Sequence, residues 1–373
     1  MTIYILLFLL CIILSYLADI QEDNGKAICI GGIVFLMCLI GGFRDLGIGT
    51  DTLVYTEDYF NSARDYSIVE LFTQESFEEY DKGYYLLNSI ASLFSSDYWI
   101  ILLFTQVLTI GLTYWGVYRL SNYFEISFVV FTFLFCFLFY NQTYNYMRQF
   151  CALGLLIFAF SYFLEEQYTK FFALQVLAFF FHSSSGLFLI VPMFYFVLDN
   201  YYGTNKIYMI MIGYICLILF LVVNFYEVLY FTADWGIYNI DYADRYGEDS
   251  NFVESDGFPR TTLLLMLFPF LLYSIAFYRK IVTPQFFFFS IIIHFSYVAI
   301  VSLAFYVVFL QRLALYFYYI DIFFVAYILS NDQFIKKVSF LYGMLMIYCW
   351  YNMYILNNDC ETYPYSSSIL GIY

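Results

Sequence analysis

The sequence contains few charged residues and very few histidines. Only 12% of its 373 residues are charged, and it has 2 histidines. Its 15 Lys and Arg are outnumbered by 30 Asp and Glu, which gives a formal net charge of -15. A protein that binds nucleic acid along the phosphate backbone needs a basic surface. The composition therefore excludes nucleic acid as the expected partner.

Motifs for metal ions, redox chemistry and nucleotides are also lacking. The eight cysteines include no Cys-x-x-Cys pair, which is the spacing typical of zinc and redox sites. There is no Gly-rich phosphate loop and no Asp-x-Asp pair, so we expect no metal and no cofactor. Most cysteines lie in apolar runs and are expected in the core, whereas Cys360 lies in a polar tail and is expected to be a free thiol. Residues 1–18 lack the basic start of a signal peptide, which favours a first membrane span.

Long apolar runs dominate what is present. Hydrophobic residues make up 63% of the chain, and the mean hydropathy is +0.75, well above a soluble domain. We expect an all-α polytopic integral membrane protein, a single domain over 1–373 with about 11–12 transmembrane helices. Two short helices are expected to meet at the outer face around His182, Ser183, Ser184 and Ser185. The candidate spans are 2–18, 27–43, 98–118, 124–140, 149–164, 171–182, 183–198, 207–223, 261–278, 286–308, 312–330 and 338–355.

The distribution of basic residues orients these spans. Short loops on one side would hold six Lys and two Arg, and the other side would hold one Lys and six Arg. Because lysines in short loops mark the cytoplasmic side, we expect the loops 44–97 and 224–260 and the C-terminus to lie outside the cytoplasm. Arginine is suited to bidentate binding of phosphate or carboxylate, although snorkelling or pairing with nearby acids is the alternative for each. The six outer arginines are Arg44, Arg64, Arg148, Arg245, Arg260 and Arg312.

The two outer loops are too long to serve only as turns. They are rich in Tyr and Trp, which favours a surface for amphipathic ligands such as sugars, although an aromatic belt at the membrane interface is the commoner explanation. The first loop begins with Arg44 and continues through Gly47 and Gly49, which permit a tight turn. Thr50 or Asp51 can then cap the following helix. Alone, this segment is better explained as a capped loop than as a ligand site.

Four short motifs together resemble the EpsG family of Wzy-like exopolysaccharide polymerases. The first is Arg44 followed by Ile48-Gly49-Thr50-Asp51 and Tyr55, after an early span. The others are Arg148-Gln149 opening a span, His182-Ser183 closing an aromatic one, and Arg312-x-x-x-Tyr316 opening a late one. They occur in the family's order between about residues 27 and 330. The acidic stretch 65–81 and the tail after 355 match no motif of the family.

The resemblance implies an enzyme of the bacterial cytoplasmic membrane, with a GT-C-like architecture and an active site on the extracytoplasmic side. It would join polyprenyl-pyrophosphate-linked oligosaccharide repeats, with polyprenyl pyrophosphate as the leaving group. A flippase and chain-length regulators would be its protein partners. The chemistry needs cations for the leaving group and a base for the acceptor hydroxyl. No metal or nucleotide is required.

Roles for individual residues follow from the same resemblance. His182 is the first candidate for the base, because imidazole exchanges protons near neutral pH, and Asp51 is the second. A structural role for His182 is an equal alternative. Asp321 lies near mid-membrane and needs a buried partner, whereas His294 is interpreted as structural. The expected pyrophosphate or substrate ligands are Arg44, Arg148, Gln149, Arg312, Tyr55, Tyr316 and Arg245.

Two other functions are compatible with a polytopic chain. A lipid-linked oligosaccharide flippase would carry cations inside the membrane along a passage, whereas here they gather at one mouth. A membrane O-acyltransferase would also use a histidine, but no such motif follows His182. We therefore rank the polymerase first, the flippase second and the acyltransferase last.

Overall fold

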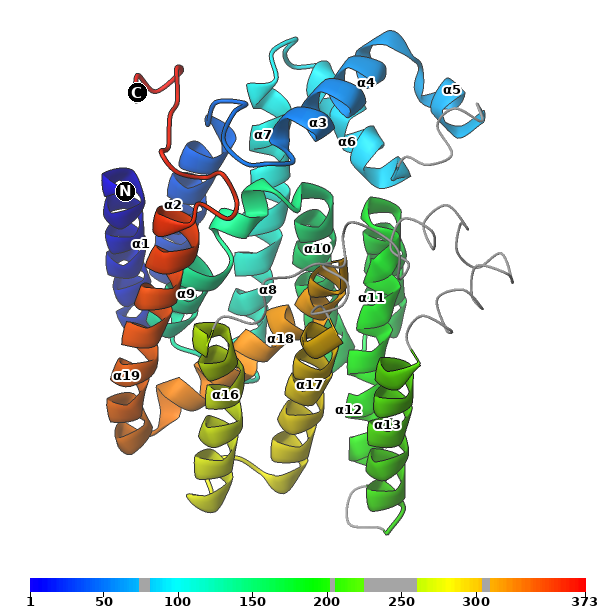
Figure 1. The fold of residues 1–373 in the computed structure, drawn as a ribbon, viewed down its shortest axis with the longest axis vertical. Coiled ribbons are helices and arrows are strands. Elements are labelled where there is room, and N and C mark those ends of the chain that lie inside the picture. The colour runs from blue at the N-terminus through cyan, green and yellow to red at the C-terminus, as the bar shows by residue number, and fades with distance from the viewer. Residues whose placement is uncertain (74–80, 202–204, 225–259, 304–308) are drawn as a thin grey trace. The chain divides into compact units, whose positions relative to one another are not determined.

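The computed structural model describes residues 1–73, 81–201, 205–224, 260–303 and 309–373, and these are helical with no strand among them (Figure 1). Seven of the described helices are long and apolar enough to cross a membrane, which confirms the predicted all-α polytopic class. The chain divides into two compact units. The first comprises Met1–Gly186, Leu329–Asn331 and Lys336–Tyr373, and the second comprises Leu187–Ile328 and Asp332–Ile335.

The first unit contains most of the apolar helices of the N-terminal half. Its long helices are α1 (Thr2–Ile20), α2 (Asp23–Gly42), α7 (Trp99–Gln106) continued through a π-helical turn into α8 (Leu112–Leu120), α9 (Phe128–Leu138), α10 (Met147–Leu164), α11 (Tyr168–Phe181) and most of α19 (Gln333–Trp350). Turns of two or three residues join α1 to α2 and α10 to α11, so each pair packs antiparallel.

One carboxylate fixes the start of α9 against the end of α1. Asp19 accepts hydrogen bonds from the Phe128 amide (2.7 Å) and the Ser127 hydroxyl (2.6 Å). The first amides of a helix have no partner within the helix, and the helix dipole favours a negative charge there. Asp19, at the end of α1, therefore caps the N-terminus of α9, a helix more than 100 residues away in the sequence.

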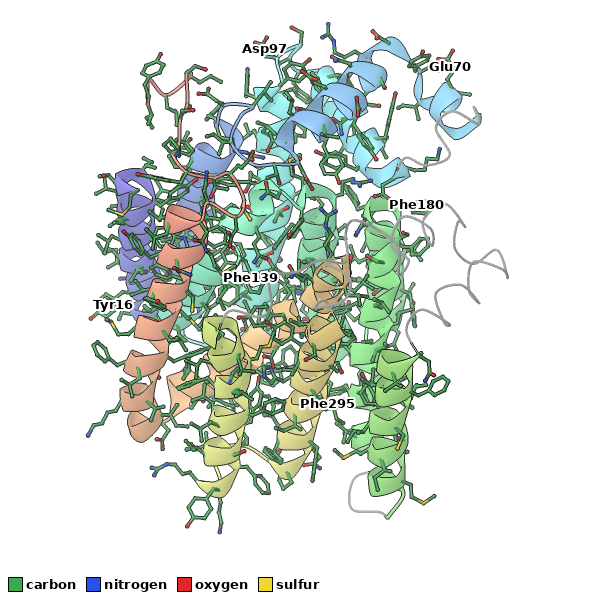
Figure 2. The ribbon with its side chains drawn as sticks, viewed as in Figure 1. Tyr16, Glu70, Asp97, Phe139, Phe180 and Phe295 are labelled. Atoms are coloured by element: carbon green, nitrogen blue, oxygen red, sulfur yellow. The ribbon has the colours of Figure 1, made fainter. Side chains whose placement is uncertain are left out.

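Short helices from the segment 44–97 gather at one end of this unit, the end that also holds both chain termini (Figure 1). Figure 2 shows Glu70 and Asp97 there. The apolar face of α6 packs over α7, which buries Ala91 against Ile101. The short helices are α3 (Thr52–Tyr55), a π-helical turn (Thr56–Phe60), α4 (Asn61–Asp65), α5 (Ile68–Thr73) and α6 (Lys82–Ser92).

The C-terminal residues return to this end and bind the loop after α2. Gly49 donates its amide to the Glu361 carbonyl (2.9 Å), and Asn145 donates to the Cys360 carbonyl (3.1 Å). Gly49 has φ of +100°, and a Cβ there would meet Asn145 Oδ1 at 2.7 Å. Cys360 is a free thiol, as predicted, but it is buried, and burial raises its pKa to about 12. The tail is thus part of the framework under the loop.

The second unit is built around α17, which packs against α12, α13 and α16. Pro269 lies inside α16, where it interrupts the helical hydrogen bonding. The described helices of this unit are α12 (Ile190–Tyr201), α13 (Asn205–Val223), α16 (Arg260–Tyr278), α17 (Pro284–Leu303) and α18 (Phe309–Asn331). The last three residues of α18 belong to the first unit.

The predicted break near His182 is confirmed. α11 ends at Phe181, and His182 has an extended backbone with φ of -161° and ψ of 115°. A 3-10 segment (Ser183–Leu189) follows, and Gln175 donates to the Ser185 carbonyl (3.0 Å). The span predicted over 124–140 was too long, because α9 begins only after Ser127, whose hydroxyl caps it, and ends at Leu138. The loop 225–259 lies outside the described residues, as do 304–308 of the predicted span 286–308.

The structure gives a sharp test of the predicted sidedness. Ser96 is exposed at the end that holds α6, and Asn122 is exposed in the turn after α8, at the opposite end of the same unit. Single cysteines at these positions should label oppositely with an impermeant reagent. Ser96→Cys should label in intact cells and Asn122→Cys only after lysis. Cys29 and Cys216, the two least buried cysteines among the described residues, should first be replaced. The reverse pattern would place the loops in the cytoplasm.

Candidate functional site

Arg148 is the second residue of α10, and its guanidinium contacts two tyrosines and a carboxylate. Nη1 donates to the Tyr59 hydroxyl (2.8 Å) and to Asp81 Oδ2 (2.7 Å), and Nη2 donates to the Tyr55 hydroxyl (2.9 Å). Within the described part of the chain, these contacts use three of the five guanidinium N–H donors. The two remaining donors and the positive end of the α10 dipole suit this place for an anion.

The same Asp81 oxygen also faces His182. His182 Nδ1 lies 3.3 Å from Asp81 Oδ2, so the carboxylate stands between the imidazole and the guanidinium. The three side chains are between 17% and 19% exposed, which lets a ligand reach them while limiting solvent screening. A carboxylate at Nδ1 favours the tautomer with the proton on Nδ1 and leaves Nε2 free to accept a proton. This is the arrangement of an oriented base.

A close backbone approach brings Asp81 to His182. Asp81 immediately precedes α6, and His182 immediately follows α11. Gly83, in the first turn of α6, lies directly against the end of α11, near the position of Phe180 in Figure 2. A Cβ at Gly83 would meet the Phe180 carbonyl carbon at 2.8 Å. Only glycine permits this contact, so the first turn of α6 positions the carboxylate.

Tyrosine rings form one wall of the site. The Arg148 guanidinium lies 4.4 Å from the ring centroid of Tyr55 and 5.5 Å from that of Tyr59. Tyr84 from α6 packs edge-to-face on Tyr59, with centroids 5.4 Å apart. Burial raises the pKa of the Tyr59 hydroxyl, although Arg148 lowers it, so the hydroxyl stays protonated. The wall thus holds the guanidinium plane beside the partly exposed Asp81 carboxylate.

Arg44 occupies a different environment from the one expected for a pyrophosphate ligand. It is 3% exposed, and it donates to the carbonyls of Gly41, Ile48 (3.3 Å) and Tyr144 (3.3 Å). It also contacts Thr52, and its guanidinium lies 4.5 Å from the Tyr144 ring centroid. Buried carbonyls require donors, so this guanidinium holds the loop after α2 against the turn before α10.

The remaining first-unit candidates lie around this core. Asp51 precedes α3 without capping it; its carboxylate is 3.5 Å from the Thr50 hydroxyl and is partly exposed. Gln149 is buried beside Arg148, at 3% exposure. Sequence reasoning missed Asp81, because an aspartate before a helix is typical of an ordinary N-cap. Here the carboxylate makes no cap contact with α6, and that can be seen only in the structure.

Two further candidates belong to the second unit, and one lies outside the described residues. Arg312 is partly buried in the first turn of α18, and Tyr316 is fully buried one turn later. The structure describes this unit by itself, so whether Arg312 joins Arg148 stays a prediction. Arg245 falls within 225–259, outside the described residues.

The second unit encloses a polar cluster within its apolar helices. Asp321 on α18 lies 2.8 Å from His294 Nδ1 on α17 and accepts a hydrogen bond from the Tyr273 hydroxyl on α16. His294 Nε2 lies 2.6 Å from the Met266 carbonyl, in the turn before Pro269. Asp321 and His294 are both 0% exposed. The prediction that Asp321 needs a buried partner is confirmed, and that partner is His294, for which the sequence had shown none.

Breaking the pair of Asp321 and His294 should lower the free energy of unfolding. Asp321→Ala leaves the Nδ1 group of His294 buried without a partner, so the free energy of unfolding should fall by about 3–5 kcal/mol. Asp321→Asn keeps a hydrogen-bonding group and should cost less. Denaturation in detergent measures both. Arg279→Ala, which removes an exposed ion pair to Asp332 (3.0 Å), serves as the control and should change stability by about 1 kcal/mol or less. Equal losses in Asp321→Ala and the control would contradict the buried pair.

Comparison with known proteins bears on the whole chain. No curated protein and no solved structure matches it. A family model, that of the EpsG family, matches residues 27–367. The match includes Arg148, Asp81 and His182, and it extends through the C-terminal residues that bind the loop after α2. Because the model covers nearly all of the sequence, the protein belongs to the EpsG family.

Proposed function

We propose that this protein polymerises polyprenyl-pyrophosphate-linked oligosaccharide repeats at the outer face of the cytoplasmic membrane. Membership of the EpsG family supports a role in exopolysaccharide polymerisation in general. The observation that carries the finer proposal is the array of Arg148, Asp81 and His182, in which a cation and an oriented base share one carboxylate oxygen. A glycosyl transfer with an anionic leaving group needs a cation for the leaving group and a base for the acceptor hydroxyl.

His182 acts as the base in this proposal. The acceptor sugar hydroxyl attacks the anomeric carbon of the donor glycan, and its proton passes to His182 Nε2. The new bond is the glycosidic C–O bond. Asp81 holds Nδ1–H and stabilises the imidazolium that forms. A general base of this kind contributes roughly 10²–10⁴-fold to the rate.

Arg148 receives the leaving group. As the bond between the anomeric carbon and the pyrophosphate oxygen breaks, its electron pair stays on the pyrophosphate. The partly exposed Arg148 guanidinium, which the Tyr55 and Tyr59 hydroxyls hold in place, faces the charge that develops. Fixed donors in a partly buried site stabilise such charge more than mobile water does. The α10 dipole adds to the same effect.

Arg44 has a positioning role in the same proposal. Its donors bind the protein's own carbonyls, including that of Tyr144, four residues before Arg148. It therefore fixes the loop that carries Asp51 and Tyr55 relative to the start of α10. Asp51 is the alternative base, since its carboxylate is partly exposed in this loop.

The glycan profile of a deletion strain complemented with variants tests this function. Arg148→Lys keeps the charge but loses the planar fork of donors, so polymerisation should fall by about 10²-fold or more. Single lipid-linked repeats should accumulate on the outer leaflet. Arg64→Lys changes an exposed arginine of α4 at the same end of the unit and should restore normal polymer.

Two outcomes would contradict the proposal. Accumulation of repeats on the inner leaflet of the deletion strain would indicate a flippase. Full polymer length and rate with Arg148→Lys, at an expression level equal to that of wild type, would remove Arg148 from the leaving-group site.

A further inference from the structure

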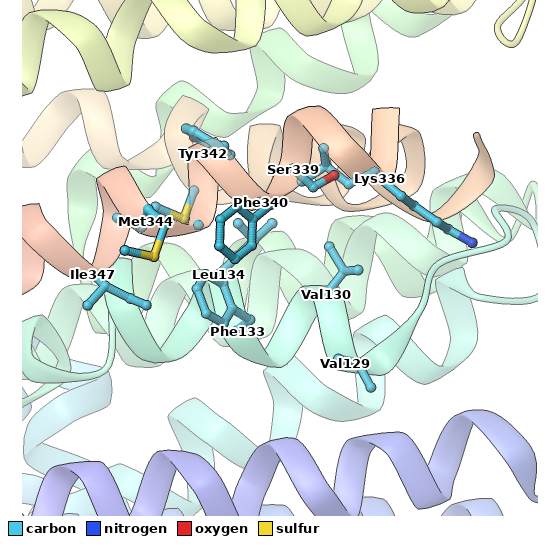
Figure 3. A pocket seen from close by; sticks show the side chains of 13 residues that line it. Val129, Val130, Phe133, Leu134, Lys336, Ser339, Phe340, Tyr342, Met344 and Ile347 are labelled. Atoms are coloured by element: carbon cyan, nitrogen blue, oxygen red, sulfur yellow. The ribbon is translucent and has the colours of Figure 1, made fainter. Parts of the chain in front are cut away.

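Two apolar hollows lie end to end along α19 in the first unit. One, of about 370 Å³, lies between α19 and α9 (Figure 3). The other, of about 530 Å³, lies between α19 and α1. Both are lined by Phe133, Met344 and Ile347, so they form one trough along the helix. We call it the α19 trough.

The two ends of the α19 trough differ in chemistry. Lys336 is the single charged side chain among the described residues that line it, and it lies at one end beside Val129 and Val130 (Figure 3). Trp350 and Tyr351 line the other end. A second ammonium, that of Lys26, lies 4.9 Å from the ring centroid of Phe128, next to Val129 in the sequence. The Asp19 carboxylate lies at the same end, where it accepts a hydrogen bond from the Val129 amide (3.3 Å). Lys336 is therefore the one cationic side chain among the described residues that line the trough, and apart from Ser339 the rest of the lining is apolar or aromatic.

The length of the trough limits its occupant. Lys336 and Trp350 are fourteen residues apart on α19, which corresponds to about 21 Å at 1.5 Å per residue. This exceeds half of the hydrocarbon thickness of about 30 Å. The lining suits one extended hydrocarbon chain, and the lysine suits the anionic headgroup at its end.

The end of the trough at Lys336 lies away from the site of Arg148, Asp81 and His182. α19 runs from Lys336 to Trp350, and the residues that follow it bind Asn145, three residues before Arg148. The lysine thus faces the leaflet opposite to the site of Arg148, Asp81 and His182. A polyprenyl pyrophosphate bound at Arg148 has its charge at the wrong end to use Lys336.

We propose that the α19 trough binds an anionic phospholipid of the leaflet opposite to the catalytic site. The phosphate lies at Lys336, and one acyl chain extends along α19 past Phe133 towards Trp350. Such a lipid would fill the space between α19 and the pair α1 and α9. The proposal does not depend on the polymerase reaction.

Tryptophan quenching in vesicles tests this site, because Trp350 lies in the trough. Trp99, Trp115 and Trp235 are replaced by Phe, which leaves Trp350 as the only tryptophan of the four in the chain. The protein is placed in phosphatidylcholine vesicles that contain phosphatidylglycerol brominated at the methyl end of its chains. A lipid in the surrounding bilayer keeps this end near the midplane, whereas a lipid held at Lys336 brings it to Trp350.

Brominated phosphatidylglycerol should quench Trp350 with an apparent affinity about fivefold higher than that of brominated phosphatidylcholine. This factor is the effect expected of one lysine near an anionic headgroup. Lys336→Gln should abolish the preference and Lys336→Arg should keep it. Lys337→Gln removes a neighbouring exposed lysine that does not line the trough and should leave the preference unchanged. Equal quenching by both lipids would overturn the proposal. So would a stronger competition by an isoprenyl phosphate than by phosphatidylglycerol, which would assign the trough to a lipid substrate.

Discussion

The Asp81 carboxylate touches both a guanidinium and an imidazole, and the geometry of the end of the first unit that carries α6 serves this contact. The helix α11 stops at Phe181, which places His182 in an extended conformation below the short helices. α10 begins just before Arg148. Gly83 lets the first turn of α6 lie against α11. If any of these three backbone features shifted, the shared oxygen could no longer meet both partners.

The charged side chains that are buried among the described residues are paired or hydrogen-bonded. A charge inside the membrane is costly unless it is paired or hydrogen-bonded. Arg44 is surrounded by backbone carbonyls, and Asp321 by His294 and Tyr273. At the far end of α8, Arg119 pairs with Glu165. The array around Asp81 differs from the sites of Arg44 and Asp321 because it is partly exposed, and partial exposure is what a ligand site requires.

The sequence predicted the features that depend on local pattern. Apolar runs predicted the helical class, and the polar interruption at His182 predicted the end of α11. Tyr55 was grouped with Arg148 as a candidate ligand, and the structure brings the two side chains into contact. The first two predictions rest on the length and polarity of local segments, and the grouping of Tyr55 with Arg148 rests on the family resemblance.

Contacts between distant residues could not be predicted in this way. Asp81 lies 67 positions from Arg148 and 101 from His182, and its place before a helix suggested only a cap. Arg44 was expected at a ligand because its carbonyl partners belong to the backbone, which carries no signal in the sequence. His294 had no partner in its own span because its partner lies on another helix. Tertiary packing decided each of these cases.

The most direct test of the account is the coupling between Asp81 and His182. A double-mutant cycle of Asp81→Asn and His182→Gln should be measured as kcat for polymerisation by purified, membrane-inserted protein. His182→Gln should lower kcat by roughly 10²–10⁴-fold. If Asp81 acts by orienting His182, the double variant should be no slower than the slower single variant. Two results would contradict the oriented base. One is a double variant whose loss of kcat equals the product of the two single losses, and the other is a near-normal kcat in His182→Gln.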